Sequence, residues 1–232
     1  MPIRFGTSGW RAIIADDFTF AHVRLVTRAI CSYLRASGVE DGASLVVSYD
    51  TRFLGEKFAA ECVEEIVNNG LKAIFCDQPT PTPAISHTIR ERAAAGGINF
   101  TASHNPPEYN GMKFSTADGA PALPDATRQV EGLIRSMGVA GESAAGESAT
   151  SDKNAANIEI YDPRPAYIAD LERKLRFDVI ASAGKTYAFD PLWGTGRGYF
   201  GDAAEEIEPR PGGYRWSARG SHESHGRSEV YF

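Results

Sequence analysis

Between residues 18 and 137 the chain alternates short apolar runs with longer segments whose apolar residues recur at helical spacing. The runs are rich in β-branched and aromatic residues and have the length of strands. The longer segments carry one apolar face and end at turn-forming residues, as helices do. Strands are expected at 44–49, 71–76, 97–101 and 111–115, and helices at 18–34, 57–69, 83–94 and 125–137. This alternation predicts an α/β domain, residues 1–137, with a largely parallel sheet.

The composition changes after residue 137. Gly, Ala, Ser and Glu dominate residues 138–157, which is typical of a flexible linker or a mobile loop. A connecting helix is expected at 162–175 and a strand at 185–189, so residues 158–200 are interpreted as the start of a second domain. Residues 201–232 show no hydrophobic periodicity, and we expect an atypical tail without regular structure.

Charge and cysteine content exclude several classes of function. The net charge of −6 argues against a nucleic-acid surface, which needs a basic stripe. No apolar run is long enough to cross a bilayer, and the first residues show no signal region, so no membrane contact is expected. The three cysteines, Cys31, Cys62 and Cys76, have the spacing of neither a zinc site nor a redox pair. We expect reduced core thiols in a cytoplasmic protein.

One loop carries the residues best suited to chemistry. Thr101-Ala-Ser-His-Asn-Pro-Pro follows a predicted strand, where ligands bind in open α/β sheets. Ser103 offers a hydroxyl nucleophile, His104 and Asn105 stand beside it, and two prolines stiffen the turn. Lys113 can meet a phosphate or accept a proton if its pKa is lowered. From residue chemistry alone, the same Ser-His-Asn sequence is also typical of a turn held by local hydrogen bonds.

Five segments in order resemble motifs of the phosphoglucomutase/phosphomannomutase family. Thr101-Ala-Ser-His-Asn-Pro is similar to its active-serine signature. The others are Phe5-Gly-Thr-Ser-Gly-Trp-Arg, Tyr49-Asp-Thr-Arg, Asn110-Gly-Met-Lys and Phe189-Asp-Pro-Leu-Trp-Gly-Thr-Gly. The resemblance implies a three-layer α/β/α first domain with a mixed, largely parallel sheet, followed by a partial second α/β domain.

The resemblance also implies a reaction. In this family the serine that matches Ser103 carries a phosphoryl group and gives it to a hexose phosphate, which forms a hexose 1,6-bisphosphate. The other phosphate then returns to the serine, and the hexose 1-phosphate and 6-phosphate are interconverted. Lys113 is the candidate for proton handling, and His104 either shares that role or orients the loop. The resemblance places Arg11 near the phosphoserine. The alternative role for Arg11 is an ion pair on the protein surface.

Further residues are assigned to phosphate binding. Thr7 and Ser8 are expected to line the entrance or bond the serine loop, and Asn105 to contact the phosphate. Arg52 either binds phosphate or braces the serine loop, and the sequence leaves both open. Family members use Mg²⁺, and the expected metal contact in this chain is Ser103 through its phosphate.

Other family motifs do not occur in this chain. They are the Asp-x-Asp-x-Asp-Arg metal loop, the loop that reads sugar hydroxyls and the loop that grips the second phosphate. We therefore expect a chain that is inactive or weakly active alone, truncated or altered in frame, with Phe189 and Leu192 on an exposed apolar face. A homo-oligomer or a complementing chain would cover that face. The alternatives are a non-catalytic phosphosugar- or protein-binding module and a remnant of a mutase. The sequence does not choose between glucose, mannose and glucosamine.

Overall fold

The computed structural model of the protein describes residues 3–6, 9–140, 155–183 and 189–199. The chain forms two compact units, residues 1–162 and 163–232, and each is described by itself. Among the described residues, no helix is long and apolar enough to cross a membrane.

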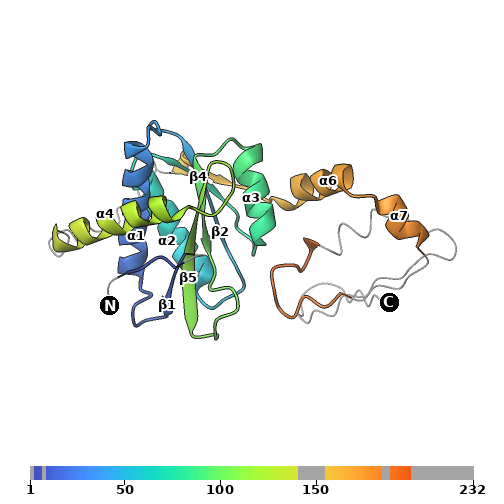
Figure 1. Cartoon of the computed structure of the whole chain (residues 1–232), viewed down its shortest axis with the longest axis horizontal. Coiled ribbons are helices and arrows are strands. Elements are labelled where there is room, and N and C mark those ends of the chain that lie inside the picture. The colour runs from blue at the N-terminus through green and yellow to red at the C-terminus, as the bar shows by residue number, and fades with distance from the viewer. Residues whose placement is uncertain (1–2, 7–8, 141–154, 184–188, 200–232) are drawn as a thin grey trace. The chain divides into compact units, whose positions relative to one another are not determined.

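The first unit alternates strands and helices along the chain (Figure 1). Its strands are β1 (Trp10–Ile13), β2 (Ser44–Tyr49), β3 (Lys72–Phe75), β4 (Gly96–Phe100), β5 (Tyr109–Thr116) and β6 (Ile158–Ile160). Its helices are α1 (Phe20–Ala36), α2 (Gly55–Asn68), α3 (Thr82–Glu91) and α4 (Pro124–Ala140). Each strand and helix predicted before residue 138 is confirmed, with ends that differ by a few residues.

The strands form one mixed sheet in the order β1-β5-β4-β2-β3-β6. The neighbours β4, β2, β3 and β6 run parallel, and β5 is antiparallel to both β4 and β1. Five strands therefore share one direction and only β5 opposes them, which confirms the predicted mixed, largely parallel sheet. The loops that follow β2 and β4 consequently leave the sheet at the same edge.

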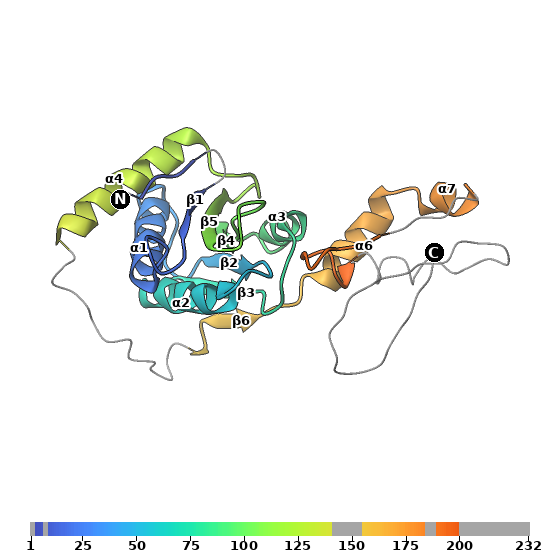
Figure 2. The same cartoon turned by 90° about the horizontal axis from the view of Figure 1, so that it is seen from below.

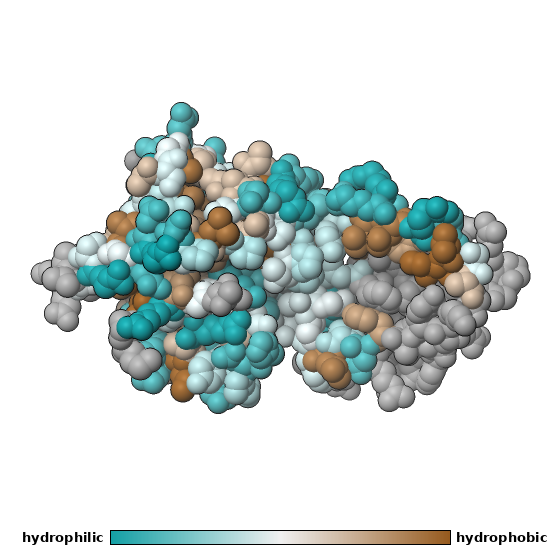
Figure 3. Space-filling model, viewed as in Figure 1, coloured by the Kyte–Doolittle hydropathy of each residue, from teal (hydrophilic) through white to brown (hydrophobic). Residues whose placement is uncertain are grey.

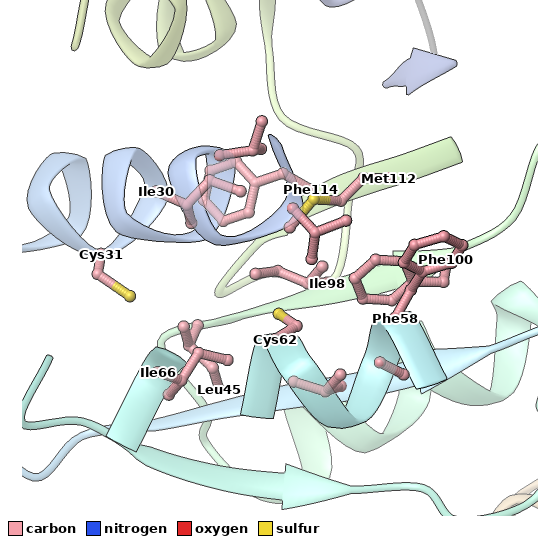
Figure 4. Packing of buried hydrophobic residues seen from close by; sticks show 14 of the residues in the cluster. Ile30, Cys31, Leu45, Phe58, Cys62, Ile66, Ile98, Phe100, Met112 and Phe114 are labelled. Carbon is pink, nitrogen blue, oxygen red and sulfur yellow. The ribbon is translucent and has the colours of Figure 1, made fainter. Parts of the chain in front are cut away.

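Helices cover both faces of this sheet, which makes three layers. Figure 2 shows α1, α2 and α4 on one face and α3 on the other. The larger core lies under α1, α2 and α4, where Phe18 is fully buried. Figure 4 shows Phe58 and Phe100 packed within it. A smaller core of Val46, Ile74, Cys76, Ile85, Ile89 and Ala94 lies under α3. As expected, all three cysteines are buried free thiols.

Differences from the predicted helix ends have local causes. Helix α2 begins at Gly55 rather than at residue 57, after Leu54 in a left-handed conformation with φ 60° and no side-chain cap. No capping residue marks that start in the sequence. Helix α3 ends at Glu91 rather than at residue 94, because Ala93 turns the chain with φ 47°. Helix α4 continues through Gly138 to Ala140, so the first residues of the predicted linker are helical. Residues 141–154 of that linker lie outside the described residues.

The sequence analysis missed two edge strands. β1 has four residues and pairs with β5, with Trp10 opposite Met112. β6 has three residues and pairs with β3, so residues 158–160 belong to the sheet of the first unit although the prediction grouped them with the second domain. Arg92 at the end of α3 binds both carboxylate oxygens of Glu159 and lies over the ring of Tyr161, which holds this edge strand in place.

The described part of the second unit contains α6 (Arg164–Lys174) and α7 (Phe177–Ser182). Helix α6 confirms the predicted connecting helix, and α7 was not predicted. Hydrophobic side chains lie on the surface of these helices (Figure 3), and Leu175 and Val179 are exposed. Leu192 is 78% exposed, as predicted, whereas Phe189 is half-buried. The rest of the predicted strand at 185–189, and the predicted tail, lie outside the described residues.

Candidate active site

The candidate site lies at the edge of the sheet where β2 and β4 end. β4 leads directly into the loop of residues 101–108, and β2 leads into residues 50–54. A main-chain hydrogen bond joins the two loops where they begin, because the Asp50 N–H donates to the carbonyl of Phe100. The fold therefore places the motif residues Arg52 and Ser103 beside each other although they are far apart in the sequence.

Ser103 stands exposed at the turn of its loop. Its backbone is in the left-handed region with φ 59°, which is costly for a residue that has a Cβ. The Ser103 N–H donates to Thr101 Oγ1 over 2.9 Å, and this bond stabilises the turn. Ser103 Oγ lies 3.4 Å from His104 Nδ1, so the imidazole is the side chain beside the hydroxyl.

The side chain of Arg52 binds the main chain of the serine loop. Its two terminal nitrogens donate to four carbonyls, those of Ser103, Asn105, Pro106 and Tyr109, over distances of 2.6–2.9 Å. Asp50 in turn lies 3.5 Å from Arg52 Nε. We call this arrangement the Arg52 brace. Of the two roles that the sequence left open for Arg52, these contacts support the bracing role.

Arg11 and Lys113 reach the same region from β1 and β5. Arg11 Nη1 donates to Asn105 Oδ1 over 3.0 Å, which brings two predicted site residues together across the sheet edge. Lys113 lies on β5, two positions from Gly111, which pairs with Arg11. The structure thus brings Arg11 and Asn105 together at the Ser103 loop, and Lys113 lies close enough to Arg11 to feel its charge. Thr7 and Ser8 lie outside the described residues, and their predicted roles stay predictions.

Lys113 is half-buried, and its environment disfavours the ammonium form. Burial lowers the pKa of Lys113 below its ordinary value, the positive charge of Arg11 lowers it further, and Asp50 opposes the shift. A lysine with a lowered pKa exchanges a proton more readily near neutral pH. This is the property that the sequence analysis required for a role in proton handling.

Gly9 and Gly111 let neighbouring segments of backbone approach each other closely beside Arg11 and Lys113. Gly9 has φ 108°, and a Cβ there would lie 2.5 Å from the carbonyl oxygen of Met112 and 3.1 Å from Lys113 Cγ. At Gly111 a Cβ would lie 2.5 Å from the Thr101 carbonyl oxygen. Gly111 is therefore required by the close approach of neighbouring backbone.

Metal-binding side chains do not cluster among the described residues. Among them, no group of three His, Cys, Asp or Glu side chains gathers in a way that could hold a metal ion. Ser103 is the single expected contact, through a phosphate, and Mg²⁺ needs several oxygen ligands.

The sequence analysis did not single out Asp50 or Asn110. The Asp50 carboxylate accepts from the Arg52 N–H over 2.9 Å and also faces its Nε, so it fixes the guanidinium that holds the loop. Asn110 is fully buried, and its Nδ2 donates to the carbonyl of Phe53 over 3.3 Å. Both residues lie inside motifs that resemble those of the family, and this position was the signal in the sequence that could have identified them.

The fold and the site together define an α/β domain that presents an exposed serine on a braced loop beside two basic side chains. Residues 2–138 match the family profile described as phosphoglucomutase/phosphomannomutase, alpha/beta/alpha domain I. Because this match covers more than half of the chain, the protein belongs to the phosphoglucomutase/phosphomannomutase family.

Individual relatives agree with this assignment. A phosphoglucomutase of Staphylococcus saprophyticus is 37% identical over 141 residues, which are 58% of this chain and 25% of the relative. A phosphoglucomutase of Komagataeibacter xylinus is 31% identical over 208 residues, 85% of this chain and 37% of the relative. The crystal structure of a "putative phosphomannomutase" from Thermus thermophilus superimposes with a TM-score of 0.76 at 34% identity, over 89% of this chain and 44% of that protein. The chain thus spans less than half the length of these relatives.

Proposed function

We propose that this chain provides the phosphoserine part of a phosphohexomutase, which interconverts hexose 1-phosphate and hexose 6-phosphate through a hexose 1,6-bisphosphate. The observation that carries the proposal is Ser103, exposed in a left-handed turn whose carbonyls are held by Arg52. Phosphoryl transfer is catalysed mainly by positioning and by charge stabilisation, so a fixed hydroxyl beside cations suits it.

In the proposed transfer, a hexose hydroxyl oxygen forms a bond to the phosphorus while the bond from phosphorus to Ser103 Oγ breaks. The hexose hydroxyl proton goes to the neutral amine of Lys113, whose lowered pKa supports this assignment, and the released Ser103 oxygen takes up a proton from solvent. In the return step Ser103 Oγ loses its proton to solvent and forms a bond to the phosphorus of the other phosphoryl group, while the bond from that phosphorus to the hexose oxygen breaks and the oxygen takes the proton back from Lys113. Arg11 lies beside the loop and supplies positive charge to the phosphoserine, and Asn105 keeps Arg11 in place.

His104 is proposed as a residue that orients the Ser103 hydroxyl, because the two side chains lie 3.4 Å apart. Thr7 and Ser8 are proposed to line the entrance or bond the serine loop, and Asn105 is proposed to contact the phosphate. Magnesium is proposed to require carboxylates outside the described residues, in the same protein or in a complementing chain. Glucose, mannose and glucosamine phosphates remain equal candidates for the hexose.

The test is phosphoryl transfer to the purified chain. We expect incubation with glucose 1,6-bisphosphate and Mg²⁺ to phosphorylate Ser103 in a fraction of the molecules, measured by intact mass before and after phosphatase. Peptide mass spectrometry locates the modified residue. Ser103→Ala abolishes the modification, whereas Ser136→Ala, which removes an exposed hydroxyl on α4, leaves it unchanged.

Absence of phosphate from Ser103 at every bisphosphate concentration would overturn the proposal. A coupled assay that starts from glucose 1-phosphate tests the second part of it. Full production of glucose 6-phosphate by the isolated chain would contradict the claim that other residues complete the site.

A further inference from the structure

A buried amide lies directly across the sheet from the candidate proton carrier. Asn99 on β4 is the register partner of Lys113 on β5, and neighbouring side chains on one face of an antiparallel pair lie about 5 Å apart. Asn99 is only 6% exposed, and it lies on the sheet face that α3 covers. It lines the same cavity as Lys113.

Both ends of the Asn99 side chain are fixed. Its Oδ1 accepts from Ser48 Oγ on β2 over 3.2 Å, and its Nδ2 donates to Thr82 Oγ1 at the start of α3 over 3.3 Å. Buried amides are normally held in this way, so the contacts alone are compatible with a structural role. They also mean that the amide cannot turn toward Lys113 without losing two hydrogen bonds. On the opposite side of Lys113, the positive φ of Gly9 lets the backbone approach the lysine side chain.

Two charged groups among the described residues shift the pKa of Lys113, one from β1 and one from the loop after β2. They are Arg11 on β1 and Asp50 at the end of β2. The helices that line the cavity contribute uncharged residues, Thr82 and Ser86 from α3 and Thr127 from α4. Apart from Lys113 itself, the residues that line this cavity are therefore uncharged.

We propose that Asn99 is a positioning residue for Lys113, a neutral neighbour that lies beside the lysine side chain across the strand pair without giving its amine a carboxylate partner. This inference rests on the proposed function, in which Lys113 exchanges a proton. An aspartate has nearly the same shape as asparagine, and it would offer the amine a negative charge at this distance. The charged form of Lys113 would then be favoured, because an opposite charge within a few ångströms stabilises it.

The experiment measures the lysine directly on the full chain. Competitive acylation with acetic anhydride at graded pH, followed by mass spectrometry, reports the fraction of neutral amine at Lys113. We expect Asn99→Asp to slow acylation of Lys113 about tenfold at a pH below its pKa. Ser48→Ala removes one hydrogen bond of the network without adding charge, so it is expected to lower stability and leave the acylation profile unchanged.

A second variant covers the case in which Asn99→Asp does not fold. Thr82→Asp places a carboxylate in the same cavity at an exposed position in the first turn of α3, where acidic residues stabilise a helix. It is expected to slow acylation of Lys113 about threefold. Unchanged acylation of Lys113 in folded Thr82→Asp and, where it folds, Asn99→Asp would overturn the proposal.

These results are separable from the outcome for phosphoryl transfer, since the amine titrates whether or not Ser103 is phosphorylated. In an assembly that turns over, Asn99→Asp is expected to move the pH profile of kcat to higher pH. A uniform loss of kcat at all pH values would instead indicate a structural role and would contradict the inference.

Discussion

The Arg52 brace gives the sharpest test of how this site is built. Replacing Arg52 with alanine removes four hydrogen bonds from a cation to the carbonyls of the serine loop and leaves Asp50 without its partner. The loop is exposed, so water replaces part of what is lost. Taking the low end for each bond, roughly 0.5–1 kcal/mol, Arg52→Ala is expected to cost about 3 kcal/mol.

The stability lost in Arg52→Ala can appear in two measurements. If the loop unfolds together with the sheet, urea denaturation reports it as a lower free energy of unfolding. If the loop opens locally, the N–H of Asn105, which donates to the Ala102 carbonyl over 3.2 Å, exchanges with solvent about a hundredfold faster. Arg52→Lys keeps the charge but not the planar fork of donors, so it is expected to recover no more than about 1 kcal/mol.

The matched control is Arg128→Ala. Arg128 pairs with Asp125 on the surface of α4, and its side chain is 69% exposed, so the loss is expected to stay below about 0.5 kcal/mol. If Arg52→Ala changes neither the free energy of unfolding by more than the control nor the exchange of the Asn105 amide, the bracing argument is refuted.

Three further predictions concern the rest of the first unit. Gly9→Ala is expected to lower the free energy of unfolding in urea by about 2 kcal/mol because of its φ of 108° and its contact with Met112. Gly138→Ala lies in α4, and its new Cβ meets no other part of the described chain within 4 Å, so it is expected to raise that free energy by up to about 0.5 kcal/mol. Burial raises the pKa of Cys31 and of Cys76 to about 12, so both thiols are expected to resist a thiol reagent at pH 8 in the native state and to react in urea. Glu159→Gln is expected to cost at most about 1 kcal/mol, an effect that high salt removes, since the ion pair with Arg92 is partly exposed.

Sequence reasoning succeeded where the signal is local. The spacing of apolar residues in α1 and the β-branched run of β2 predicted these elements, because each buries one face or both faces against the sheet. β1 and β6 were missed because four and three residues carry little periodicity, and their stability comes from pairing with distant strands. The bonds of Arg52 span 51 to 57 positions in the sequence, and no local pattern specifies them.

The contacts of Arg52 also decide which cations are left for a phosphate. A guanidinium has five N–H groups. Four of those on the terminal nitrogens point to loop carbonyls, and the fifth, on Nε, faces Asp50. An Arg52 held in this way has no donor to offer a phosphoryl group, and the Asp50 carboxylate offsets its charge. A phosphoserine at position 103 would therefore depend on Arg11 and on Lys113 when that lysine is protonated. Arg11→Ala is then expected to reduce phosphorylation of Ser103 far more than it reduces stability, whereas Arg52→Ala is expected to reduce both.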